Sequence, residues 1–213
     1  DLDGIQLTWA IMIYGFVASV LPVWLLLTPR DYLSTFLKIG TIVALAIGIL
    51  IVSPALQMPA VTHFIDGSGP VFSGALFPFL FITIACGAVS GFHALISSGT
   101  TPKMLENETH VRMIGYGGML MESFVAIMAL AAAASLDPGV YFAMNSPAAL
   151  IGTDANTAAE VITIKLQFPV DAATLLHTAK EVGENTILSR AGGAPTLAVG
   201  MAHIMSRLIP GEA

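Results

Sequence analysis

The sequence is short of charge, of basic residues and of cysteine. Charged residues make up 10% of its 213 positions, against about 25% in an average soluble domain, which argues against an ordinary water-soluble protein. Only 8 Lys and Arg stand against 14 Asp and Glu. No basic surface is therefore available to neutralise phosphates, and nucleic acid is excluded as an expected partner. The single cysteine, Cys86, permits no disulfide within the chain.

Apolar residues are abundant instead, at 55% of the chain, and they form long uncharged runs. Residues 7–27 contain no charge, and a helix of that length rises about 32 Å, enough to cross a hydrocarbon core of about 30 Å. Residues 32–52 are broken only by Lys38, which lies near one end, and residues 113–136 only by Glu122. We expect each run to form a transmembrane helix.

A further run, residues 67–102, has no charged residue apart from His93. One straight helix of that length would measure about 54 Å, too long for a single crossing. Glycines and Pro78 interrupt the run, so we expect a helix at 71–95 and non-helical backbone within 85–101. The predicted fold is an all-α, polytopic transmembrane bundle with four crossings, the third of them broken.

Half of the charged residues lie after Ser135, in little more than a third of the chain. The pattern there predicts short amphipathic helices: one at 171–182 capped by Asp171, one at 158–166, and one beginning after Pro195. We therefore predict a transmembrane part at 1–136 and an extramembrane or interfacial helical part at 137–213.

Two uncharged runs in this second part, 138–153 and 191–206, contain proline and glycine. They are short for a membrane crossing, and we expect surface-lying or re-entrant segments. The chain opens with DLDG, which has neither a methionine nor a basic n-region. The first apolar run therefore does not have the features of a cleaved signal peptide, and we expect the chain to be an internal piece of a longer protein.

Basic residues predict the orientation, because Lys and Arg in short loops favour the cytoplasm. Arg30 and Lys38 lie at the connection between crossings one and two, and Lys103 and Arg112 between three and four. The loop at 53–70 has no basic residue. We expect the first and third connections to be cytoplasmic, and the start of the chain, the second loop and the region after the fourth crossing to lie on the other side.

Glu122 is the first candidate for function. A carboxylate at the centre of a transmembrane helix costs about 2.5–3.5 kcal/mol on insertion scales, and Gly117 and Gly118 just before it would let another backbone approach. We favour a protonatable or cation-coordinating group that faces the bundle interior. The alternative is a structural carboxylate satisfied by a neighbouring helix.

The second candidate is the segment 85–101. Gly87 and Gly91 form a GxxxG pair, and Gly99 follows. Hydroxyls are dense beside these glycines, at Ser90, Ser97, Ser98, Thr100 and Thr101. An unwound helix lining a substrate or ion path and simple small-residue packing both remain open. His93 is either a proton carrier in that path or a hydrogen-bonded structural residue.

Enzyme signatures are missing from the sequence. There is no GxSxG, Walker A, HExxH or CxxC motif and no GxGxxG, and we predict no catalytic activity, no cofactor and no metal site. Ser90 and His93 share a helix face, and an intramembrane hydrolase is therefore a third, weaker hypothesis. Their spacing alone does not make a nucleophile and its base.

Four segments, in this order, resemble the carbon starvation protein A (CstA) family of bacterial membrane transporters. They are FITIACGAVSGFHALISSGTTPKML, RMIGYGGMLMESFVAIMALAAA, PGVYFAMNSP and LSRAGGAPTLAVGMA. The similarity extends over nearly the whole chain. One position departs from the family pattern, Ala191, where a threonine is usual, and a function that needs that hydroxyl would be lost.

The resemblance implies the central part of a longer multi-pass protein of the bacterial inner membrane, with further helices on both sides. It implies a secondary transporter that takes up peptides, or in some members pyruvate, in carbon starvation, coupled to protons or sodium. The substrate, the coupling ion and the oligomeric state stay open. The alternative is a membrane-embedded sensor or scaffold without transport.

Overall fold

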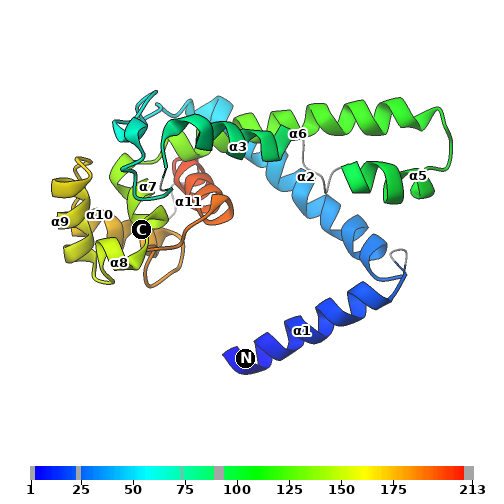
Figure 1. Ribbon diagram of the computed structural model, residues 1–213, viewed down its shortest axis with the longest axis horizontal. Helices are drawn as coiled ribbons and strands as arrows, with labels where there is room; N and C mark the ends of the chain where they lie inside the picture. The colour runs from blue at the N-terminus through cyan, green and yellow to red at the C-terminus, as the bar shows by residue number, and fades with distance from the viewer. Residues whose placement is uncertain (1–2, 23–24, 73, 89–93, 209–213) are drawn as a thin grey trace. The chain divides into compact units, whose positions relative to one another are not determined.

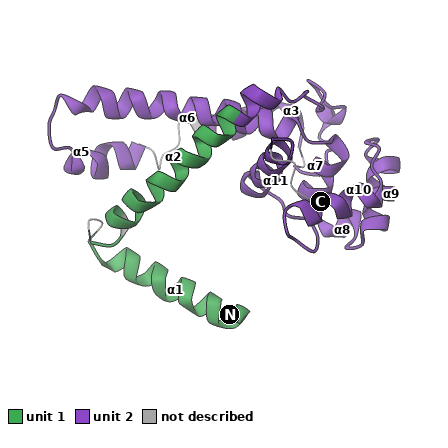
Figure 2. Ribbon diagram, turned by 180° about the vertical axis from the view of Figure 1, so that it is seen from behind, with its two compact units in different colours: residues 1–47 green, residues 48–213 purple. Residues whose placement is uncertain are grey.

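The computed structural model describes residues 3–22, 25–72, 74–88 and 94–208 (Figure 1). Its regular elements are all helices, and no β-strand occurs within these ranges. The prediction of an all-α fold is confirmed. The chain divides into two compact units, residues 1–47 and 48–213 (Figure 2).

The first unit holds helix α1 (Gly4–Val20) and most of α2 (Leu27–Val52). Asp3 and Gln6 form a capping box at the start of α1. The side chain of each residue accepts a hydrogen bond from the backbone N–H of the other. The helix ends earlier than the predicted crossing at 7–27, because Leu21 is extended (φ −74°, ψ 149°). Leu21 precedes Pro22, and a residue before proline is disfavoured in the helical region.

The side chains of α1 lie almost entirely on the surface of this unit. No residue of the helix is buried, and Trp9, Ile11 and Phe16 are 59%, 61% and 70% exposed. The Arg30 guanidinium at the start of α2 donates a hydrogen bond to the Tyr14 hydroxyl over 2.9 Å. Exposed apolar surface of this extent is typical of a helix that meets lipid or other helices.

The second unit begins with apolar helices of different lengths: α3 (Leu76–Ala88), the π-helical turn η2 (Ile96–Thr100), α5 (Thr101–Met104) and α6 (His110–Ala134). In the described part of the chain, α2 and α6 are long and apolar enough to cross a membrane, whereas α1 and α3 are shorter. The third crossing, predicted at 71–95, starts later, at Leu76, and its first turn is interrupted at Phe77, which precedes Pro78 and has an extended backbone (φ −108°, ψ 130°).

The remaining helices are α7 (Pro138–Asn145), α8 (Ala148–Ile151), α9 (Ala155–Lys165), α10 (Ala172–Glu181) and α11 (Gly193–Ser206). Their apolar faces meet in one core. Its fully or nearly fully buried members include Phe142, Met144, Ile151, Ile162, Leu175 and Val199. The amphipathic helices predicted after Ser135 are confirmed in kind, and their predicted ends differ from those in the structure by one to three residues.

Aspartate side chains start three of these helices. The carboxylates of Asp137, Asp154 and Asp171 accept backbone N–H groups over 2.8, 3.0 and 2.7 Å respectively. Each bond satisfies a donor that has no partner inside the helix. The predicted cap at Asp171 is confirmed.

The uncharged run 138–153 does not lie on the surface of this unit, and the expectation that it is re-entrant in a membrane stays a prediction. It forms α7 and α8, and six consecutive or near-consecutive residues of α7, from Gly139 to Asn145, are buried. An uncharged run too short to cross a membrane can be the centre of a packed core. In this unit the core explanation holds.

The loop between α2 and α3 is fastened to the end of α6 and to α7. The backbone N–H groups of Gln57 and Met58 donate to the Ala134 carbonyl over 2.8 and 3.2 Å. Phe64, in the short helix η1 (Phe64–Asp66), meets the Phe142 ring edge-on at 5.5 Å. The second loop therefore lies at the same end of α6 as the helices that follow it.

Helices α6 and α11 touch at backbone distance. Ala132 of α6 is fully buried and Gly200 of α11 is buried. A Cβ atom at Gly200 would lie 2.6 Å from the Ala132 carbonyl oxygen, closer than real contacts allow. Only glycine lets the two helices approach this closely.

Candidate functional site

Glu122 lies at the midpoint of α6, among exposed apolar side chains. Its neighbours Met121 and Phe124 are 52% and 47% exposed. A Cβ at Gly117 or Gly118 would meet no atom within 4 Å, so side-chain space is open one turn before Glu122. The role of Glu122 remains a prediction.

The hydroxyl-rich segment is described in part. Ser90, Gly91 and His93 fall outside the described residues, and Gly87 lies near the end of α3. Ser97, Ser98, Gly99 and Thr100 belong to the π-helical turn η2, and Thr101 starts α5.

Both serine hydroxyls of this turn bond back to the chain, donating to the Ala94 carbonyl over 3.1 Å from Ser97 and 2.8 Å from Ser98. Wide turns of this kind are rare and often occur at functional sites. Among the described residues, none of these hydroxyls bonds to Glu122. The predicted substrate or ion path through this segment stays a prediction.

A different polar centre forms where α7 meets the start of α11. Asn145, only 7% exposed, donates from Nδ2 to the Thr196 hydroxyl over 3.0 Å and to the Tyr141 carbonyl over 3.1 Å. Its Oδ1 accepts the Gly192 N–H over 3.1 Å, and the Thr196 hydroxyl donates to the Gly192 carbonyl over 2.9 Å. One buried amide thus fixes the turn that begins α11.

This turn needs glycine at position 192. Gly192 has φ +124° and ψ 165°, a conformation that side chains disfavour. No side chain caps the start of α11 in the described structure. The N–H groups at the beginning of such a helix have no partner within it.

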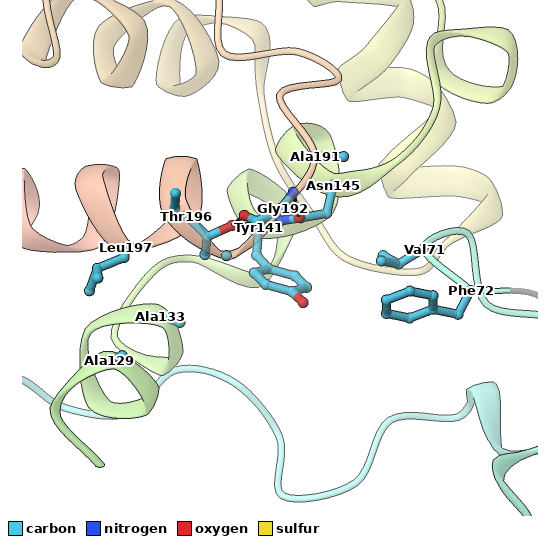
Figure 3. Close-up of a pocket in the computed structure, with 12 residues that line it drawn as sticks. Val71, Phe72, Ala129, Ala133, Tyr141, Asn145, Ala191, Gly192, Thr196 and Leu197 are labelled. Atoms are coloured by element: carbon cyan, nitrogen blue, oxygen red, sulfur yellow. Dashed lines mark hydrogen bonds between the residues drawn. The ribbon is translucent and has the colours of Figure 1, made fainter. Parts of the chain in front are cut away.

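A pocket of about 650 Å³ opens beside this centre (Figure 3). Its wall comes from α6, α7, the start of α11 and the loop before α3, with the residues Val71, Phe72, Ala129, Ala133, Tyr141, Asn145, Ala191, Gly192, Gly193, Ala194, Thr196 and Leu197. None of these twelve residues is charged. Such a mostly apolar wall with a few polar groups is typical of small-molecule sites.

Tyr141 stands between this pocket and a second one of about 280 Å³, and both are also lined by Val71 and Phe72. Its ring lies between Asn145 and Phe72, with the hydroxyl directed away from Asn145 (Figure 3). Burial raises the pKa of the Tyr141 phenol above its ordinary value of 10.0. The hydroxyl therefore stays protonated and can donate a hydrogen bond.

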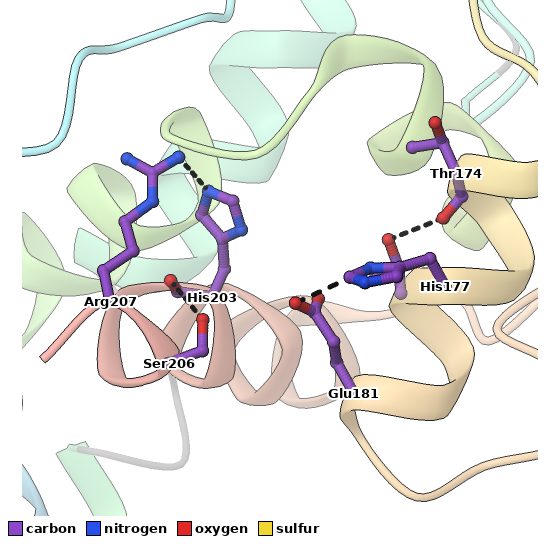
Figure 4. A network of polar contacts seen from close by, with 7 residues as sticks. Thr174, His177, Glu181, His203, Ser206 and Arg207 are labelled. Atoms are coloured by element: carbon purple, nitrogen blue, oxygen red, sulfur yellow. Dashed lines mark hydrogen bonds and ion pairs between the residues drawn. The ribbon is translucent and has the colours of Figure 1, made fainter. Parts of the chain in front are cut away.

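A polar network lies on α10 and α11 of the same unit (Figure 4). The His177 ring and the Glu181 carboxylate are 3.7 Å apart on α10. On α11 the Arg207 guanidinium lies 3.0 Å from His203 Nε2, which must accept, since a guanidinium only donates. Burial, and next the Arg207 charge, lower the pKa of His203 below 6.5, and Glu181 opposes them.

The lowered pKa of His203 predicts that acid destabilises this unit. As the pH falls through 6.5, His203 becomes protonated in the unfolded chain but stays neutral in the folded protein. The free energy of unfolding therefore falls as the pH drops through and below 6.5. We expect the thermal midpoint of the intact protein to fall less between pH 7.5 and 5.5 in His203→Gln than in the wild type. His177→Gln on α10 is the control. Equal slopes in the wild type and His203→Gln would contradict this explanation.

The whole chain, residues 1–213, matches the family model described as Carbon starvation protein CstA. The chain belongs to this family. It is 67% identical over 99% of its length to the peptide transporter CstA of Escherichia coli K12 and 60% identical over 97% to the peptide transporter CstA of Helicobacter pylori 26695. It is also 56% identical over 96% of its length to the pyruvate/proton symporter BtsT of Escherichia coli K12.

The chain covers only 31%, 30% and 31% of the lengths of these three relatives. No solved structure matches it. The relatives are named as transporters, which suggests a protein that is not an enzyme.

Sequence reasoning missed the pocket of this CstA family chain, although two of the segments that carried the resemblance build it. PGVYFAMNSP supplies Tyr141 and Asn145, and LSRAGGAPTLAVGMA supplies Gly192 and Thr196. The available signal was a polar asparagine at the end of an otherwise apolar short helix. Ala191, where the resemblance leads us to expect a threonine, also lines this pocket.

Proposed function

We propose that this chain is part of a secondary active transporter for peptides or small carboxylates such as pyruvate, in the inner membrane of a bacterium. The observation that carries the proposal is identity above 50%, over nearly all of the chain, to proteins named as a peptide transporter and as a pyruvate/proton symporter. Because the chain covers 31% of those proteins, the activity belongs to the intact protein.

Exposed apolar helices support the membrane location. Along α6 the side chains of Met113, Tyr116, Ile127 and Leu130 are 60–78% exposed, a surface that water would disfavour. We propose four crossings, which include α1, α2, α3 and α6. Helix α6 would rise about 37 Å, enough for a hydrocarbon core of about 30 Å.

The contacts of the second loop, residues 53–70, with the helices after α6 support the orientation expected from the basic residues. The bonds from Gln57 and Met58 to Ala134, and the contact of Phe64 with Phe142, hold this loop on the helices that follow α6. Both would lie on the non-cytoplasmic side. Lys103 and Arg112, close to the other end of α6, would then face the cytoplasm.

Cysteine labelling from each side of the membrane tests this topology. In a background without other cysteines, His63→Cys and His177→Cys are expected to react from the same, non-cytoplasmic side, and Lys103→Cys from the cytoplasm. All three native side chains are exposed. Labelling of positions 63 and 103 from one side would contradict the proposed orientation.

We further propose that Glu122 carries the coupling ion. Its place at the midpoint of α6 puts a charge where insertion costs about 2.5–3.5 kcal/mol, and intramembrane carboxylates of this kind occur in proton relays. The relative BtsT is named a pyruvate/proton symporter, which favours a proton over sodium.

Uptake by the intact protein in proteoliposomes tests the proposed function. Labelled dialanine and labelled pyruvate are offered with an inward proton gradient, with the gradient collapsed by a protonophore, and with a sodium gradient instead. Accumulation of either substrate that needs the proton gradient is the expected result. A sensor or scaffold would accumulate neither substrate under any gradient.

A further inference from the structure

The polar network on α10 and α11 places one carboxylate between two histidines that belong to different helices. Helices α10 and α11 touch within the second unit. Glu181 ends α10, and its carboxylate lies between the His177 and His203 rings in the view of Figure 4. The Glu181 side chain is only 29% exposed, so its charge is screened less than that of a carboxylate in open water.

His203 in its neutral form is bound to its own helix. The Arg207 guanidinium, four positions further along, donates to Nε2 over 3.0 Å. Nε2 can accept this bond only when the ring is neutral and carries its proton on Nδ1. The observed contact therefore specifies both the charge state and the tautomer of His203.

A second proton on the ring removes this acceptor. An imidazolium and a guanidinium both only donate, so the bond between His203 and Arg207 would be lost and two like charges would lie side by side. Arg207 is exposed and can turn toward water. Of the charges that act on His203, that of Arg207 repels a proton on the ring and that of Glu181 attracts it.

Three further helices meet α11, and within the described residues they bring no other charge to His203. Helix α6 meets α11 at Ala132 and α2 meets it at Gly48, and both positions lie in uncharged stretches. Helix α7 contributes Tyr141, which lies beside the start of α11 rather than its end. The partner of His203 is thus decided between Arg207 and Glu181.

We infer that His203 is a proton-operated switch between α10 and α11: the neutral ring accepts from Arg207 on its own helix, and the ring protonated from solvent releases Arg207 and pairs with Glu181 on α10. The inference goes beyond the proposed transport function and is separate from the proposed role of Glu122. The switch lies one turn after Gly200, where α11 packs against α6, so the exchange of partner acts on a helix that contacts α6. Because the pKa of His203 lies below 6.5, the exchange belongs to acidic surroundings.

Imidazole ¹⁵N NMR of the intact protein, labelled at histidine, tests this exchange. The His203 signals are those that vanish in His203→Gln. We expect Nε2 to have the chemical shift of an acceptor at pH 7.5 and to titrate below pH 6.5. Arg207→Gln should raise the midpoint of this titration and Glu181→Gln should lower it. Glu160→Gln, a matched change on an exposed part of α9, should leave it unchanged, and an unaltered midpoint in Glu181→Gln would overturn the inference.

Double-mutant cycles separate an exchange of partner from a general effect of charge. Thermal midpoints of the intact protein are compared at pH 7.5 and 5.0 for the single and double variants of His203→Gln with Glu181→Gln, and of His203→Gln with Arg207→Gln. The coupling of positions 203 and 181 should be small at pH 7.5 and stabilise by about 1–3 °C at pH 5.0. The coupling of positions 203 and 207 should stabilise at pH 7.5 and be lost at pH 5.0. Couplings that are the same at both pH values would overturn the inference and make the network a fixed surface cluster.

Discussion

The intact protein carrying Glu122→Gln is expected to exchange substrate across the membrane without concentrating it. Glutamine keeps the shape of the side chain but cannot carry a proton. Since Glu122 lies at the midpoint of α6, its loss should uncouple transport from the proton gradient and leave the fold intact. Labelled dialanine should reach its external concentration inside the vesicles and rise no further, whereas counterflow of preloaded substrate continues.

Glu106→Gln is the matched control, because Glu106 is exposed in the short connection before α6. It should accumulate substrate like the wild type. Normal accumulation by Glu122→Gln would show that the carboxylate is not needed for coupling, and His93 would become the next candidate. Loss of folded protein in that variant would instead make Glu122 a structural residue.

Gly200→Val is expected to have the largest effect on stability. The close approach of α6 and α11 leaves no room for a side chain, since a Cβ would lie 2.6 Å from the Ala132 carbonyl oxygen and 2.8 Å from its carbon. Backbone atoms cannot move aside cheaply, so we expect a cost of about 3 kcal/mol, at the upper end for overpacking. The thermal midpoint in detergent should fall clearly, with loss of monodisperse protein.

Gly193→Val provides the comparison on the same helix, because a Cβ at Gly193 would meet no atom within 4 Å. Its thermal midpoint should stay close to that of the wild type. Equal stability of the two variants would mean that α6 and α11 do not approach each other as described. The pocket wall at Ala129 and Ala133, which depends on that approach, would then also be in doubt.

Much of the local helical structure could be predicted from the sequence, because it depends on neighbouring residues. Period and capping chemistry predicted α10 with its Asp171 cap, and uncharged length predicted α2 and α6. Helix ends were predicted less well where a proline follows. The residues before Pro22 and Pro78 are extended, so α1 ends early and the first turn of α3 is interrupted at Phe77.

The pocket could not be predicted in the same way, because it depends on contacts between distant residues. Asn145 bonds to Gly192 and Thr196, which are 47 and 51 positions away. No periodicity within α7 indicates that its last residue will fix the start of α11. For the same reason the composition of residues 138–153 predicts a surface-lying or re-entrant segment where α7 is buried, since an apolar helix in a core and one at a membrane surface have similar compositions.

Acidification of the vesicle lumen on addition of dialanine tests coupled transport most directly. Proteoliposomes with the intact protein and a trapped pH indicator start without any proton gradient, and dialanine added outside the vesicles supplies the only driving force. We predict that the lumen acidifies as dialanine enters, and that Glu122→Gln abolishes the signal. Entry of labelled dialanine with no change in luminal pH would contradict proton-coupled transport.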